Sequence, residues 1–147
     1  MARVLVASDA PSVRRAVVSV TAGPGIEVEE VASGPEVVRS VLATAPDLVI
    51  LDMQMASMGG MAVCLELRLE ESYLDVPHVS VLMLLDRRPD VFLARRSGAE
   101  GWLVKPLDPI RLRRATRALL AGETYFDESY QPVPVLAGPA ATTGPTS

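Results

Sequence analysis

The sequence predicts a single α/β domain built on a doubly wound parallel sheet, and three observations lead to this prediction. Strand-length apolar runs alternate with segments of helical periodicity five times between residues 3 and 121. The clearest runs, 48–51 and 79–85, are apolar except for Ser80, as expected of strands buried on both faces of a sheet. The chain has 147 residues, of which 49% are hydrophobic and only 4% aromatic, and this suffices for one aliphatic core.

The first two predicted strands are each followed by a helix. Residues 3–7 form an apolar run, and Pro11 then suits the first turn of a helix whose valines recur at helical spacing. A turn at 23–25 ends that helix, and residues 26–31 alternate between apolar and acidic side chains, as an edge strand does. The second helix opens at 33–35.

The segment 61–71, which follows the third strand and its loop, fits two patterns. Its three leucines alternate as in a strand, whereas Met61, Cys64 and Leu65 have helical spacing. Because strands and helices alternate elsewhere in the chain, we predict a helix here.

The last two strand–helix pairs are shorter. The fourth strand, 79–85, leads to a helix over 89–97 that Gly98 ends. The fifth strand, 101–104, leads to the last helix, 108–121.

The folded domain is therefore expected to span residues 1–121. Residues 122–147 are rich in Pro, Ala, Gly and Thr, so we predict a largely disordered tail without an output domain. The net charge of −4 argues against a nucleic-acid surface, and no direct DNA binding is expected. A single cysteine and a single histidine exclude an intramolecular disulfide and a Cys/His metal cluster. No signal peptide or membrane-spanning run is apparent, and we expect a cytoplasmic protein without membrane contact.

Charged residues stand where four of the predicted strands end. Asp9 follows the first strand, Asp52 the third, Asp86 the fourth and Lys105 the fifth, and Lys105 is the only lysine in the chain. In open parallel sheets, ligands bind beyond these carboxyl ends. An aspartate at a strand end often only caps a helix or starts a turn, but the arrival of the whole set on one edge favours a functional site.

These residue types suit phosphoryl transfer. Carboxylate and carbonyl oxygens are the ligands that Mg²⁺ prefers, and Asp9, Asp52 and the backbone carbonyl of Gln54 are the candidate donors. A carboxylate such as that of Asp52 also serves as a nucleophile towards phosphorus. Lys105 would then offset the negative charge of the phosphoryl oxygens.

The order of elements and three motifs resemble the CheY-like receiver domains of two-component signalling. The motifs are Asp9 after the first strand, LVILD ending in Asp52, and GAEGWLVKP ending in Lys105-Pro106. The resemblance covers residues 2–121 approximately. It implies a flavodoxin-like (βα)5 fold with a five-stranded sheet of order 2-1-3-4-5. It also implies Mg²⁺-dependent phosphorylation of Asp52 and a cis peptide bond before Pro106.

The sequence departs from the family pattern at several positions. Ser8 stands where receivers carry a second acid, which implies weaker Mg²⁺ affinity, and the loop 55–60 lacks the usual proline. Leu85 takes the place of a Thr or Ser whose hydroxyl bonds the phosphoryl group, and Asp86 follows where a small residue is usual. The partner aromatic of the fifth strand is the bulky Trp102. The usual hydroxyl–aromatic switch is therefore expected to be disabled, whereas phosphorylation itself is still expected.

The leading hypothesis is a single-domain response regulator of a phosphorelay, phosphorylated at Asp52 by a histidine kinase or a small phosphoryl donor and acting through a downstream protein partner. The alternative is a pseudo-receiver that binds its partner independently of phosphorylation. An enzyme with a small-molecule substrate is not expected, because no second catalytic pair stands out. Arg111, Arg114 and Arg117 lie along the last helix, where receivers often bind partners, so an acidic partner or a homodimer through the last strand and helix is a candidate.

Overall fold

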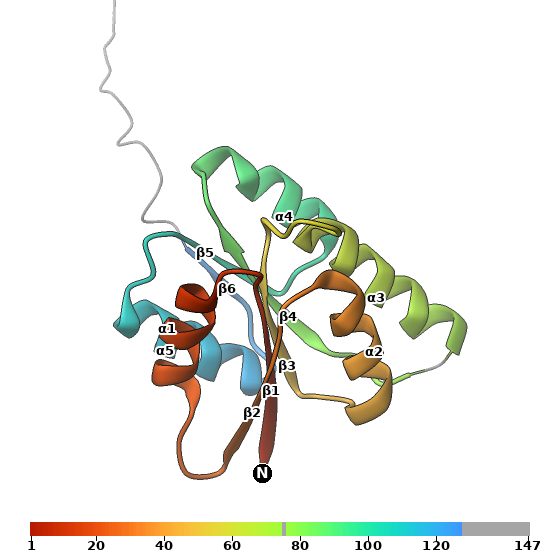
Figure 1. The fold of residues 1–147 in the computed structure, drawn as a ribbon, viewed down its shortest axis with the longest axis horizontal. Coiled ribbons are helices and arrows are strands. Elements are labelled where there is room, and N and C mark those ends of the chain that lie inside the picture. The colour runs from red at the N-terminus through yellow and green to blue at the C-terminus, as the bar shows by residue number, and fades with distance from the viewer. Residues whose placement is uncertain (75, 128–147) are drawn as a thin grey trace, which may run out of the picture.

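The computed structural model describes residues 1–74 and 76–127, which form one sheet with helices on both faces (Figure 1). In chain order the elements are β1 (Ala2–Ala7), α1 (Pro11–Thr21), β2 (Ile26–Val31), α2 (Gly34–Thr44), β3 (Leu48–Asp52), α3 (Gly60–Leu74), β4 (Ser80–Leu85), the 3-10 helix η1 (Arg88–Asp90), α4 (Val91–Ser97), β5 (Gly101–Val104), α5 (Pro109–Leu120) and β6 (Tyr125–Phe126). The strand order is β2-β1-β3-β4-β5-β6, and every neighbouring pair is parallel.

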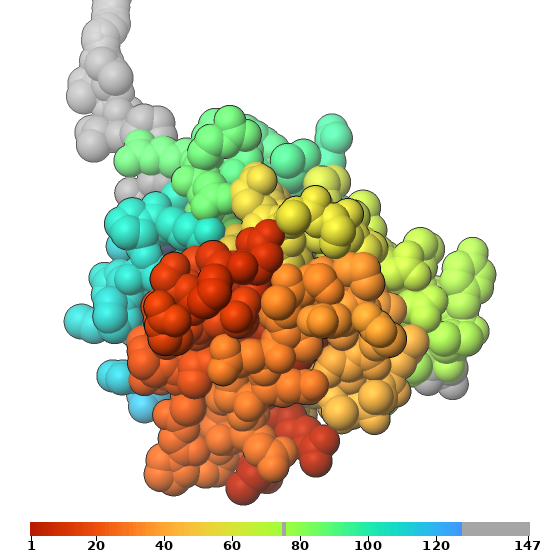
Figure 2. All heavy atoms as spheres, viewed as in Figure 1, coloured from red at the N-terminus to blue at the C-terminus, as the bar shows by residue number. Residues whose placement is uncertain are grey.

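Two apolar cores fill the spaces between the sheet and its helices, because alternate residues of a strand point to opposite faces. One core lies under α1 and α5 and joins Val17, Leu112 and Leu119 to Ile50 and Leu84 of the central strands. The other lies under α2, α3 and α4 and takes the alternate residues of the same strands. The helices α1 and α2 flank the edge strand β2 (Figure 1), and the space-filling view of the same side shows the red and orange atoms of the N-terminal segments covering this edge (Figure 2).

The predicted fold class and the strand order 2-1-3-4-5 are confirmed. The ambiguous segment 61–71 is helical and lies within α3. Leu65 and Leu69 are 42% and 50% exposed, whereas Leu67 is buried, so α3 carries leucines on both faces and its spacing imitates a strand. Within residues 1–74 and 76–127, no helix combines the length and the apolar character that a membrane span requires.

The sheet has a sixth strand, and the prediction of five strands is corrected here. Beyond Gly122, whose φ of +83° ends α5, the chain returns parallel to β5 at its open edge. The Tyr125 N–H donates to the Glu100 carbonyl (3.2 Å), and the Asp127 N–H donates to the Trp102 carbonyl (3.1 Å). Because a strand of two residues has no recognisable period and precedes a biased tail, the expected boundary at residue 121 leaves it out.

This strand covers the edge of β5 through which a homodimer was expected. Asp127 follows this strand directly, and its Oδ2 lies 3.1 Å from Nη1 of Arg111, so this arginine is engaged within the chain. Arg114 and Arg117 are exposed on α5. The remainder of the predicted tail, 128–147, lies outside the described residues.

Candidate functional site

The residues singled out by sequence meet at the carboxyl edge of the sheet. Because β1, β3, β4 and β5 are parallel, the residues at their carboxyl ends lie side by side. All five residues of β3 are buried, and Asp52 at its end is only 2% exposed. A carboxylate at this depth requires hydrogen-bond partners to offset its desolvation.

Both oxygens of Asp52 have such partners. The Ser8 hydroxyl donates to Oδ2 at 2.7 Å, and Ser8 itself is fully buried. The ammonium of Lys105 donates to Oδ1 at 3.0 Å, and the N–H of Gln54 reaches the same oxygen at 3.3 Å. Asp52 is thus held in one orientation by the residues that directly follow β1 and β5 and by the loop after β3.

Lys105 bridges two carboxylates. Its Nζ also donates to Oδ1 of Asp86 at 2.8 Å, a shorter distance than to Asp52. Burial by itself lowers the pKa of Lys105, but the bonds to Asp86 and Asp52 outweigh it and raise this pKa above its ordinary 10.5. The ammonium is therefore charged at neutral pH. The peptide bond between Lys105 and Pro106 is cis, in agreement with the expectation.

The predicted metal donors are partly assembled. Asp9 is exposed and its Oδ2 accepts the N–H of Ala56 at 2.8 Å, which connects the end of β1 to the loop after β3. Among the described residues, no three His, Cys, Asp or Glu side chains are grouped so as to hold a metal ion. Two carboxylates, Asp9 and Asp52, and the carbonyl of Gln54 are oxygen donors of the type that suits Mg²⁺, which usually keeps several waters.

Leu85 and Trp102, which the sequence comparison with receivers places at the switch positions, are both buried, at 0% and 2% exposure. The Phe126 ring stacks on Trp102 with 4.4 Å between ring centroids, and the Arg95 guanidinium lies 5.3 Å from the centre of the Trp102 ring. The indole Nε1 is the one buried side-chain polar atom without a hydrogen-bond partner among residues 1–74 and 76–127. The indole is therefore held between β6 and α4.

Three contacts were missed by sequence reasoning. Ser8 was read only as a missing acid, whereas it is a hydrogen-bond donor to Asp52. Asp86 stands out in the sequence only as a departure from a usual small residue, which does not predict its pairing with Lys105 at the neighbouring strand end. The stacking of Phe126 on Trp102 could not be predicted either, because the only sequence feature that points to it is the pair of adjacent aromatic residues Tyr125 and Phe126.

A second cluster of charges lies at the amino edge of the sheet, around Arg68 of α3. Its guanidinium pairs with Glu71 (2.8 Å) and Glu100 (2.7 Å), and His78 lies between the same two carboxylates at 3.1 and 2.9 Å. Burial raises the pKa of Glu71, but the hydrogen bond from the Val79 N–H, with His78 and Arg68, outweighs it and lowers this pKa below its ordinary 4.5. The cluster ties α3 to the segments that start β4 and β5.

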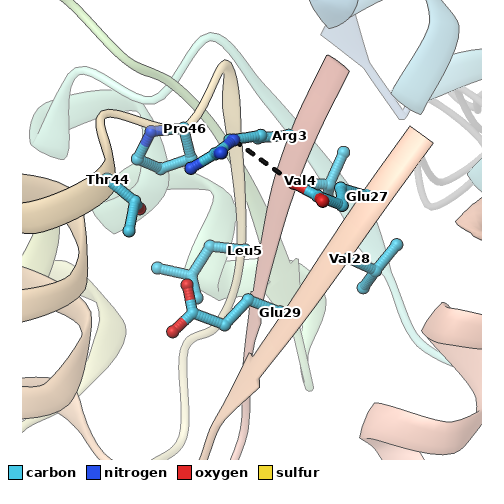
Figure 3. Close-up of a pocket in the computed structure, with 8 residues that line it drawn as sticks. All are labelled: Arg3, Val4, Leu5, Glu27, Val28, Glu29, Thr44 and Pro46. Carbon is cyan, nitrogen blue, oxygen red and sulfur yellow. Dashed lines mark ion pairs between the residues drawn. The ribbon is translucent and has the colours of Figure 1, made fainter. Parts of the chain in front are cut away.

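A groove of about 300 Å³ also lies at the amino edge (Figure 3). Its walls come from the starts of β1 and β2 and from the end of α2, and the ion pair of Arg3 and Glu27 (3.3 Å) joins the two strands. None of Asp9, Asp52 or Lys105 lines it. The groove is therefore separate from the candidate site.

One protein family matches the chain. The family model of the response regulator receiver domain matches residues 4–117. The chain is 34% identical over 118 residues to the DNA-binding response regulator MtrA of Mycolicibacterium smegmatis, covering 80% of this chain and 50% of MtrA. It is 30% identical over 146 residues to the response regulator PleD of Caulobacter vibrioides, covering 95% of this chain and 32% of PleD. The chain thus spans half or less of the length of these relatives.

Solved structures agree with this match. The chemotaxis protein CheY4 of Vibrio cholerae superposes with a TM-score of 0.69 at 30% identity, covering 81% of this chain and 98% of that one. The signal receiver domain of a histidine kinase from Syntrophus aciditrophicus gives a TM-score of 0.73 at 28% identity, covering 83% and 92%.

Proposed function

The chain belongs to the family of response regulator receiver domains of two-component systems, and we propose that it accepts a phosphoryl group on Asp52 and acts through a protein partner. The observation that carries the proposal is the buried Asp52 carboxylate, bonded to the only lysine of the chain at the carboxyl edge of the sheet. The donor is a histidine kinase or a small acyl phosphate.

The reaction follows from the partners of Asp52. A carboxylate oxygen of Asp52 attacks phosphorus, the bond from phosphorus to the donor atom breaks, and the donor leaves with that electron pair. Ser8 and Lys105 hold the carboxylate, and the Lys105 ammonium offsets the charge of the transferred oxygens.

Asp9, Asp52 and the Gln54 carbonyl are the residues that would hold Mg²⁺. Bound there, the ion supplies positive charge to the phosphoryl oxygens. With Ser8 in place of a further acid, the site has two carboxylates for the ion, and we propose weak Mg²⁺ binding, because affinity depends on the number of charged ligands.

The pseudo-receiver alternative is not favoured. It was motivated by Ser8, Leu85 and Asp86, but the family match is to response regulators, and the Asp52–Lys105 pair is retained. A role independent of phosphorylation gives no reason for that buried pair.

The test is the intact-protein mass after incubation with Mg²⁺ and acetyl phosphate. We expect the wild type to gain one phosphoryl group and Asp52→Asn to gain none. Glu123→Gln, which removes an exposed acid, is the control and should react as the wild type does. A folded wild type that gains no mass would refute the proposal, and so would an equal gain in Asp52→Asn.

A further inference from the structure

The two residues through which a receiver ordinarily responds are fixed in this protein. Leu85 is buried and has no hydroxyl to bond a phosphoryl group, and Trp102 is held by Phe126 and Arg95. A response to phosphorylation therefore needs another side chain that senses charge at Asp52.

Asp86 meets that requirement. It is the residue after β4, its carboxylate is 34% exposed, and it is paired with the Lys105 ammonium at 2.8 Å. The same nitrogen lies 3.0 Å from Asp52. The two carboxylates therefore share one cation, and a change of charge at Asp52 changes the share that Asp86 receives.

We propose that Asp86 reports the phosphorylation of Asp52 by losing Lys105 to the phosphoryl group. This inference rests on the proposed function, because it requires the phosphorylated carboxylate. Phosphorylation replaces the single charge of the Asp52 carboxylate with a group that carries about −1.5 to −2 charges and three strong acceptor oxygens, so this group competes well for a shared ammonium. Asp86 is then a carboxylate without its cation beside a multiply charged anion, and repulsion drives it towards solvent.

The displacement of Asp86 can be transmitted to a nearby helix. One residue, Arg87, separates Asp86 from η1, and α4 follows η1 directly. The Arg87 N–H and guanidinium both bond the buried Asp90 carboxylate at 3.2 Å, which joins this turn to the start of α4. A displaced Asp86 therefore acts on η1 and α4, whose outer face carries Phe92, 73% exposed.

The direction of this response is opposite to the one that the family pattern implies. There, a hydroxyl at the position of Leu85 is attracted inward by the phosphoryl group. Here, the next residue is released outward, because its carboxylate and the phosphoryl group have the same sign of charge.

The experiment is amide hydrogen exchange over residues 86–97, with and without phosphorylation of Asp52 by acetyl phosphate and Mg²⁺, in the full chain. In the wild type we expect phosphorylation to speed exchange in this segment about fivefold, the factor for loss of one hydrogen bond of ordinary strength. Asp86→Asn and Asp86→Ala should gain the phosphoryl group and show no further change. Glu123→Gln should respond as the wild type does.

Intact mass read on the same samples separates the two proposals. Phosphorylated wild type with unchanged exchange would overturn the role of Asp86 and leave the phosphoacceptor intact. So would an Asp86→Ala protein that responds as strongly as the wild type. Absence of any mass gain in all variants would overturn the phosphoacceptor proposal and the role of Asp86 with it.

Discussion

The carboxylate of Asp127 should be one of the larger single contributors to stability, although it lies beyond the last helix. It is 2% exposed, and its Oδ2 accepts the Val104 N–H at 3.0 Å. The same carboxylate is paired with the Arg111 guanidinium at 3.1 and 3.2 Å. Asp127→Ala removes both interactions at once and should destabilise the fold.

The magnitude follows from these contacts. A buried N–H that loses its acceptor costs about 1–3 kcal/mol, and an ion pair with a partly exposed arginine contributes about 0–1 kcal/mol. We therefore expect Asp127→Ala to lower the free energy of unfolding by about 2–3 kcal/mol, a fall in Tm on the order of 10 °C for a domain of this size. Asp127→Asn keeps an oxygen for Val104 and should lose only about 1 kcal/mol.

The assay is urea unfolding followed by tryptophan fluorescence, because Trp102 is the only tryptophan and β6 covers it. Glu123→Gln, an exposed acid in the same segment, should stay within about 0.5 kcal/mol of the wild type. An Asp127→Ala protein with the wild-type midpoint and slope would refute the reasoning, since the Asp127 carboxylate would then contribute nothing measurable to stability.

Three further predictions concern the two charge clusters. Ser8→Asp should tighten Mg²⁺ binding by about tenfold, measured by calorimetry, and lower stability without metal, because a second buried carboxylate then faces Asp52. Lys105→Met should slow phosphoryl gain from acetyl phosphate by about 100-fold or more, and an unchanged rate would exclude its role as charge partner. Glu71→Gln should lose about 1 kcal/mol at pH 7 in urea unfolding. Because the pKa of Glu71 is lowered on folding, its contribution is present above pH 4.5 and is lost as the pH falls through the lowered value, so the two proteins should converge in acid; a constant gap would contradict this.

Much of the fold could be predicted because its signals are local. The runs at 48–51 and 79–85 are apolar except for Ser80, and burial on both faces of the sheet is the physical cause of that pattern. Once the strands are parallel, their carboxyl ends must share an edge, so topology alone places Asp52 and Lys105 on the same edge of the sheet.

The parts that could not be predicted depend on side-chain placement. The Lys105 ammonium donates to both Asp52 and Asp86, and its two distances differ by only a few tenths of an ångström. The spacing of residues in the sequence does not determine such side-chain positions. The strand β6 owes its position to Asp127 and to the stacking of Phe126, which are long-range contacts rather than local preferences. A strand of two residues is specified by the residues that it contacts and not by the hydrophobic periodicity of its own sequence.

The shortness of β6 also affects the tendency of the protein to self-associate. An exposed sheet edge presents unpaired N–H and C=O groups that another chain can join, and proteins limit this with short or charged edge strands. At one edge of this sheet, β2 carries Glu27, Glu29 and Glu30, all exposed. At the other edge, β6 pairs with β5, and this strand has only two residues with which another chain could pair. The acidic side chains of β2 disfavour pairing at one edge, and the shortness of β6 disfavours it at the other. The sheet therefore gives little support to edge-to-edge aggregation.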